Sequence, residues 1–288
     1  MRRKGNAAMS LKSLLVFVDD SEASPRRLET AIAMAQTHGA HLSARAVLEQ
    51  PAYYYGIGSE VAADVYLEDV ERVRALAGEV AEAAERRLAQ AGHDGGVARE
   101  TGVPAAVSEV AARDARYADL ALVGQPVEGP QETLLLKVFE GVLFESGRPL
   151  AVVPSGWSGG AFGKRVMIAW SPRKEAARAV GDALPFIEAA EAVHIAMVDP
   201  ATGDSAHGEE PGADLGAALS RHARDVSVDQ LTSSGLSVGD RLLRHAEESG
   251  ADLIVMGGYG HWRLRQMLFG GVTHELLRKS KVPLLLAH

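Results

Sequence analysis

The second half of the sequence repeats the first, and this repeat narrows the possible folds more than any other feature. The segment ADLALVG (118–124) corresponds to ADLIVMG (251–257), and SGRPLAVV (146–153) corresponds to SKVPLLLA (280–287). Between the halves lies SGWSGGAFGK (155–164), whose glycine and serine content is typical of a short linker. We therefore expect two tandem domains of one fold, at residues 10–155 and 163–288.

Each half contains five short, branched apolar runs, most of them followed by a longer segment of helical period. The runs are 14–18, 41–47, 96–100, 119–124 and 148–154 in the first half, and 165–170, 192–198, 226–231, 252–258 and 282–288 in the second. This alternation predicts βαβ units, because parallel strands need a crossover connection. The clearest helix is expected at 65–90, where apolar residues recur at steps of three and four. The predicted fold is α/β, with two doubly wound, five-stranded parallel sheets.

Composition excludes several classes of protein. No apolar run approaches the roughly 20 residues that a membrane span needs, and the basic start MRRKGNAAMSLK lacks the apolar core of a secretory signal, so we expect a cytoplasmic protein. The absence of cysteine excludes disulfides and thiolate chemistry. A net charge of -8 argues against a general nucleic-acid binder. No P-loop, GxSxG or HExxH pattern is present, and we expect no enzyme with a side-chain nucleophile and its base.

Glycines cluster after the fourth predicted strand of the second half, in MGGYGHWRLRQMLFGGVTHELLRKS (256–280). Glycine lets backbone N–H groups approach phosphate oxygens, and a helix starting near Gly270 would aim its free N–H groups at the same point. In a doubly wound sheet, ligands bind beyond the carboxyl ends of the strands, at the switch point between the first and fourth strands. Segment 257–288 also holds five Lys and Arg residues against a single acid, Glu275. The pattern predicts a phosphate site, although a tight turn and a helix dipole would explain the same residue types.

The spacing Gly257-x2-Gly260-x9-Gly270 and the repeated five-strand unit resemble the universal stress protein family, whose ATP-binding members carry G-x2-G-x9-G-[ST] after the fourth strand. The resemblance implies a fold of the adenine-nucleotide α-hydrolase type. It also implies a site for ATP, or for ADP or AMP, with which Mg²⁺ can bind. The residues implied for the base and floor are Trp170, Ser171, Met197 and Val198, and those implied for the triphosphate are Gly257, Gly260, Gly270, Gly271, Val272 and Thr273. Gly271 departs from the family pattern, which has Ser or Thr there.

The first half keeps other parts of the pattern. Prolines interrupt its corresponding segment, and Glu140 is expected near the position of Gly270, so we predict that this half has lost triphosphate binding. It retains the acidic residue that ends the family's first strand, Asp19, whereas the second half has Ser171 there. The resemblance also implies that the two halves pair through their final strands as an intramolecular pseudo-dimer. Whether two such chains also form a homodimer stays an open question at this point.

The sequence is compatible with three functions. The leading interpretation is a stress-response protein that binds an adenine nucleotide in its second half and regulates partners without turnover. The alternatives are a slow nucleotide hydrolase and a nucleotide-free interaction module. Other motifs predict less: the pair His38 and His41 is expected at the solvated surface, and Tyr53, Tyr54 and Tyr55 are expected in a loop near the ligand edge of the first sheet.

Overall fold

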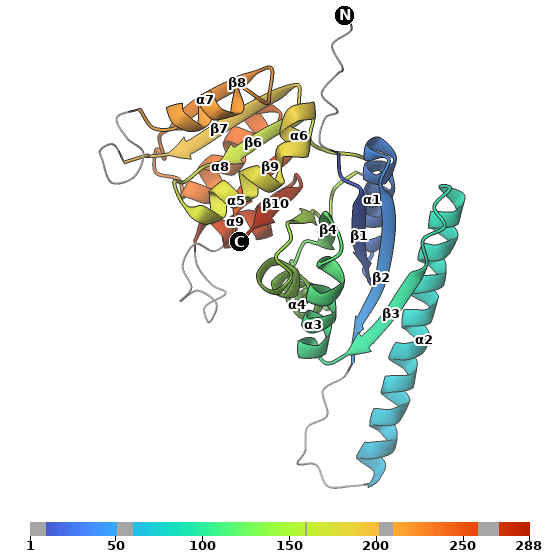
Figure 1. The fold of residues 1–288 in the computed structure, drawn as a ribbon. Helices are drawn as coiled ribbons and strands as arrows, with labels where there is room; N and C mark the ends of the chain where they lie inside the picture. The colour runs from blue at the N-terminus through green and yellow to red at the C-terminus, as the bar shows by residue number, and fades with distance from the viewer. Residues whose placement is uncertain (1–9, 51–59, 159, 202–209, 259–270) are drawn as a thin grey trace, which may run out of the picture. The chain divides into compact units, whose positions relative to one another are not determined.

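The computed structural model describes residues 10–50, 60–158, 160–201, 210–258 and 271–288 (Figure 1). Residues 12–161 form one compact unit, and residues 162–288 belong to the other. Gly260, Gly270 and the tyrosines at 53–55 lie outside the described residues. Each unit is a complete α/β domain by itself.

The first unit is a parallel sheet in the order β3-β2-β1-β4-β5. Its strands are β1 (Ser13–Val18), β2 (His41–Glu49), β3 (Val97–Gly102), β4 (Leu120–Gly124) and β5 (Leu150–Val153). Its helices are α1 (Ser24–His38), α2 (Glu60–Gln90), α3 (Pro104–Ala115), α4 (Glu132–Glu140) and the π-helical turn η1 (Gly141–Glu145). The strand order reverses between β1 and β4, which makes this pair the switch point.

The second unit repeats this topology in the order β10-β9-β6-β7-β8. Its strands are β6 (Arg165–Ala169), β7 (Ala192–Val198), β8 (Val226–Leu231), β9 (Leu253–Gly257) and β10 (Leu284–Ala287). Its described helices are α5 (Lys174–Asp182), α6 (Leu184–Ala189), α7 (Ala213–Leu219), α8 (Val238–Ser249) and α9 (Val272–Lys279). Here the switch point lies between β6 and β9.

The strand registers align the two halves residue by residue. Leu14 of β1 pairs with Leu120 of β4, and Val166 of β6 pairs with Leu253 of β9. Gly124 and Gly257, the last residues of β4 and β9, therefore occupy equivalent positions. The predicted fold class and the tandem repeat are both confirmed.

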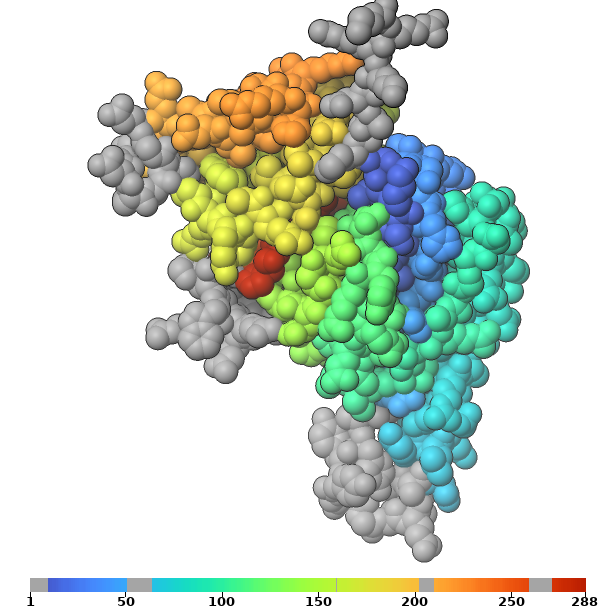
Figure 2. All heavy atoms as spheres, viewed as in Figure 1, coloured from blue at the N-terminus to red at the C-terminus, as the bar shows by residue number. Residues whose placement is uncertain are grey.

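The central strands are apolar because helices cover both faces of a doubly wound sheet. Leu14, Val16, Leu120 and Leu122 have no exposed surface. The predicted helix at 65–90 begins earlier, at Glu60. The N-terminal turns of α2 extend away from the rest of the first unit (Figures 1 and 2), and Leu67 there is 59% exposed. Among the described residues, no helix is both long and apolar enough to cross a bilayer.

Candidate ligand site at the switch point of the second half

A cavity of about 420 Å³ opens at the switch point of the second half. Its walls come from the carboxyl ends of β6, β7 and β9 and from the first turns of α5, α8 and α9. This is the place where a doubly wound sheet is expected to bind its ligand. The volume lies within the range of small-molecule and cofactor sites, which is roughly 300–1,000 Å³.

The cavity brings together the predicted site residues that the structure describes. They come from the ends of three strands and the start of one helix, and they are Trp170, Ser171, Met197, Val198, Gly257, Gly271, Val272 and Thr273. The other two predicted residues, Gly260 and Gly270, lie outside the described residues. Trp170 and Thr273, 103 positions apart in the chain, thus line one cavity because parallel strands place their carboxyl ends at one edge of the sheet.

Two glycines shape the walls. Gly257 ends β9 directly against the first turn of α5, and a Cβ at this position would lie 2.6 Å from Ala176 N. Gly271 precedes α9 with φ +95°, a backbone conformation that residues other than glycine rarely adopt. The N-cap residue Gly271 has no side chain to cap this helix, so within the described residues the first N–H groups of α9 can face an anion in the cavity.

The sequence interpretation missed several lining residues, which are Arg173, Glu175, Ala176, Asp199, Val238, Leu242 and Met256. Met256 could have been found, because it precedes Gly257 at the end of the same strand. Val238 and Leu242 could not, because only tertiary packing brings α8 to the cavity.

Glu175 is the most unexpected of these residues. It lies in the first turn of α5 and is 5% exposed. Within the described residues, the ion pair of its carboxylate is with Lys174 Nζ at 3.6 Å, and Lys174 itself is mostly solvated. A buried carboxylate therefore faces the predicted nucleotide site, and the counter-charge that Lys174 supplies to it is weak.

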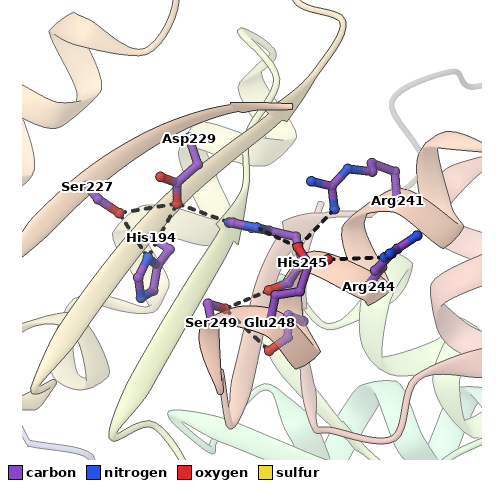
Figure 3. A network of polar contacts seen from close by, with 9 residues as sticks. His194, Ser227, Asp229, Arg241, Arg244, His245, Glu248 and Ser249 are labelled. Carbon is purple, nitrogen blue, oxygen red and sulfur yellow. Dashed lines mark hydrogen bonds and ion pairs between the residues drawn. The ribbon is translucent and has the colours of Figure 1, made fainter. Parts of the chain in front are cut away.

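A polar network holds α8 against the sheet beside the cavity (Figure 3). Oδ2 of Asp229 on β8 lies 3.0 Å from Nε2 of His245 on α8 and 3.3 Å from Nδ1 of His194 on β7. Ser227 Oγ donates to the same carboxylate oxygen at 3.2 Å. Because His245 and Leu242 belong to the same helix, the network also positions one wall of the cavity.

The other residues singled out in the sequence, Glu140, His38 and His41, lie in the first half. Glu140 is the last residue of α4, and its carboxylate accepts a hydrogen bond from Lys137 Nζ at 2.7 Å. Because Gly270 lies outside the described residues, the expected correspondence of Glu140 with Gly270 stays a prediction, and so does the loss of triphosphate binding in the first half. His38 ends α1, half-buried, and His41 is exposed. Within the described ranges no cluster of His, Asp and Glu is arranged to hold a metal ion.

Two doubly wound domains in one chain, the second with a cavity at its switch point, define an α/β protein with tandem Rossmann-like domains. The sequence model of the universal stress protein family matches residues 10–154 and 163–288, and the chain belongs to this family.

Individual proteins and solved structures are similar to this chain over different parts of its length. Universal stress protein Slr1230 of Synechocystis sp. is 37% identical over 46 residues, a match that covers 16% of this chain and 16% of that protein. A universal stress protein structure from Archaeoglobus fulgidus covers 95% of both chains at 22% identity, with a TM-score of 0.68, and shows the same fold. Another from Archaeoglobus fulgidus, in complex with dAMP, covers 50% of this chain and 98% of its own, at 17% identity and a TM-score of 0.30.

Proposed function

We propose that this protein binds an adenine nucleotide, ATP or its close relatives ADP and AMP, in the cavity of its second half. In this proposal it acts in the cytoplasm as a stress-response regulator. The observation that carries the proposal is the convergence of Trp170, Met197, Gly257 and Gly271 on one cavity at the switch point.

The chemistry of the walls supports a nucleotide. Met197, Met256 and Leu242 supply an apolar surface that suits a base. The start of α9 supplies backbone N–H groups and the positive end of a helix dipole, which suit a phosphate. A nucleotide has this combination of an apolar base and an anionic tail.

A matched pair of variants tests the site. Gly271→Glu would place a carboxylate at the start of α9, where a Cβ has open space, and Gly271→Gln would impose the same backbone strain without the charge. Calorimetric titration with ATP is expected to give one site per chain in the unmodified protein. We expect the Glu variant to lose at least tenfold more affinity than the Gln variant because of charge repulsion. Equal affinity in both variants, or no binding by the unmodified protein, would refute the proposal.

Regulation without turnover is the second part of the proposal. No nucleophile with an adjacent base is recorded among the cavity residues described above. We expect no release of ADP or inorganic phosphate above background from a stoichiometric complex of protein, ATP and Mg²⁺, followed over hours by chromatography. Steady release that disappears in Gly271→Glu would instead establish a slow hydrolase.

A further inference from the structure

The side chain of Arg27, on α1, lies at the switch point of the first half. Its Nε donates a hydrogen bond to the carbonyl oxygen of Phe17 at 2.7 Å, and its Nη2 donates to Oδ2 of Asp19 at 2.5 Å. Its Nη1 lies so close to Gly124, the last residue of β4, that a Cβ there would overlap it. The guanidinium group therefore bridges the carboxyl ends of β1 and β4, where a sheet of this topology binds its ligand.

Both charged side chains of this ion pair are buried. The side chains of Arg27 and Asp19 are 2% and 0% exposed. The second carboxylate oxygen of Asp19 accepts a hydrogen bond from the backbone N–H of Ser21 at 2.8 Å. The backbone N–H of Asp19 donates a hydrogen bond to Ser24 Oγ at 2.9 Å. Two buried charges thus satisfy each other, and removal of either one alone would leave the other uncompensated.

The second half differs at the two equivalent positions. Counted along the sequence without gaps from the equivalent strand residues Leu14 and Val166, Ser171 corresponds to Asp19 and Ala179 corresponds to Arg27. Ala179 is fully buried and has no side chain beyond Cβ. The half with the small residues has the cavity of about 420 Å³ at its switch point, lined by Ser171. The first half has a smaller cavity of about 250 Å³, which Asp19 lines and which lies between α1 and α2.

We propose that Arg27, held by Asp19, is an internal occupant of the ligand position in the first half. This autoinhibitory contact restricts the chain to one ligand, in the second half. The family's acidic residue is present in the first half, but its carboxylate is already bound to a guanidinium group of the same domain. The inference rests in part on the proposed function, since it treats the equivalent cavity as a nucleotide site.

Exchange of the two residues between the halves tests the inference. The variant Ser171→Asp/Ala179→Arg copies the Arg27 contact into the second half and is expected to lose ATP binding by at least a hundredfold in calorimetry. The reciprocal variant Asp19→Ser/Arg27→Ala carries the matched change in the first half and is expected to keep the affinity of the second-half site. Two nucleotides per chain in the unmodified protein, or unchanged affinity in the first variant, would overturn the inference and leave nucleotide binding intact.

A second measurement needs no nucleotide. We expect Arg27→Ala to lower Tm by about 10 °C, because it leaves Asp19 buried without a counter-charge. Ethylguanidinium chloride should restore part of that loss, compared with sodium chloride at equal ionic strength, because it fits the space that the side chain vacates. It should not raise the Tm of the unmodified protein or of Asp19→Ser/Arg27→Ala. A Tm unchanged by Arg27→Ala, or no specific recovery, would mean that Arg27 does not occupy a closed site, even if the protein binds no nucleotide at all.

Discussion

Glu175 decides how the cavity balances the charge of a ligand. Its carboxylate is buried beside the predicted phosphate site, where like charges repel each other more strongly than in water. We predict that Glu175→Gln strengthens binding of ATP without Mg²⁺ on the order of tenfold, and that it reduces the dependence of binding on Mg²⁺. Titrations with Mg²⁺ and with EDTA measure both effects. Weaker binding by the variant would show that the carboxylate accepts a hydrogen bond from the ligand.

His38 gives stability a dependence on pH. Burial, with the positive charge of Lys12 as a smaller cause, lowers the pKa of His38 from its ordinary value of 6.5. The unfolded chain therefore binds a proton more readily than the folded one as pH falls below 6.5, so stability is full above that pH and is lost as pH falls through the folded pKa. His38→Gln should reduce the difference in unfolding free energy between pH 7.5 and pH 5.5 in urea titrations. An identical difference in the variant would count against this account.

At the scale of the element, α8 depends on the carboxylate of Asp229. Two histidines and one serine share this carboxylate between β7, β8 and α8. We predict that Asp229→Ala costs about 2 kcal/mol of unfolding free energy, because hydrogen bonds to charged groups are lost. It should also weaken nucleotide binding, because Leu242 of α8 lines the cavity.

Asp214→Ala is the matched control for this change, since Asp214 is an exposed aspartate on α7 in the same half. Its effect should stay within about 0.5 kcal/mol. If both variants lose the same stability in urea unfolding, the network does not hold α8 in place.

At the scale of the whole molecule, pairing of the two halves through their final strands stays a prediction. Along β5 and β10 and the residues just before them, alternate backbone groups already face the neighbouring strand of the same sheet. The carbonyl oxygens that accept hydrogen bonds from the β4 and β9 side are those of Pro149, Val153, Pro283 and Ala287. The intervening amides point to the opposite side of each strand. If the strands pair, hydrogen exchange should be slow at four amides, those of Leu150, Val152, Leu284 and Leu286. Fast exchange at all four would exclude this pairing.

Much of the molecule could be predicted from local sequence. Strand segments such as DLIVMG can be recognised as short apolar runs, because helices cover both faces of a parallel sheet. The repeat then predicts that each strand has a counterpart, and the glycines at 257 and 271 mark positions where backbone must come close or turn. The element order and the described part of the predicted site follow from these local signals.

Tertiary structure decided what occupies each switch point. The segment SPRRLETA indicates a helix with two arginines, but nothing local shows that Arg27 turns inward to Asp19 whereas Arg26 stays exposed. Likewise, the burial of Glu175 and the meeting of His194, Asp229 and His245 join residues from separate elements. Sequence periodicity determined which segments form strands and helices, because that pattern reflects the solvent on each face. Only the packed fold determined which charges are buried together, because the energy of a buried charge depends on partners that are distant in the chain.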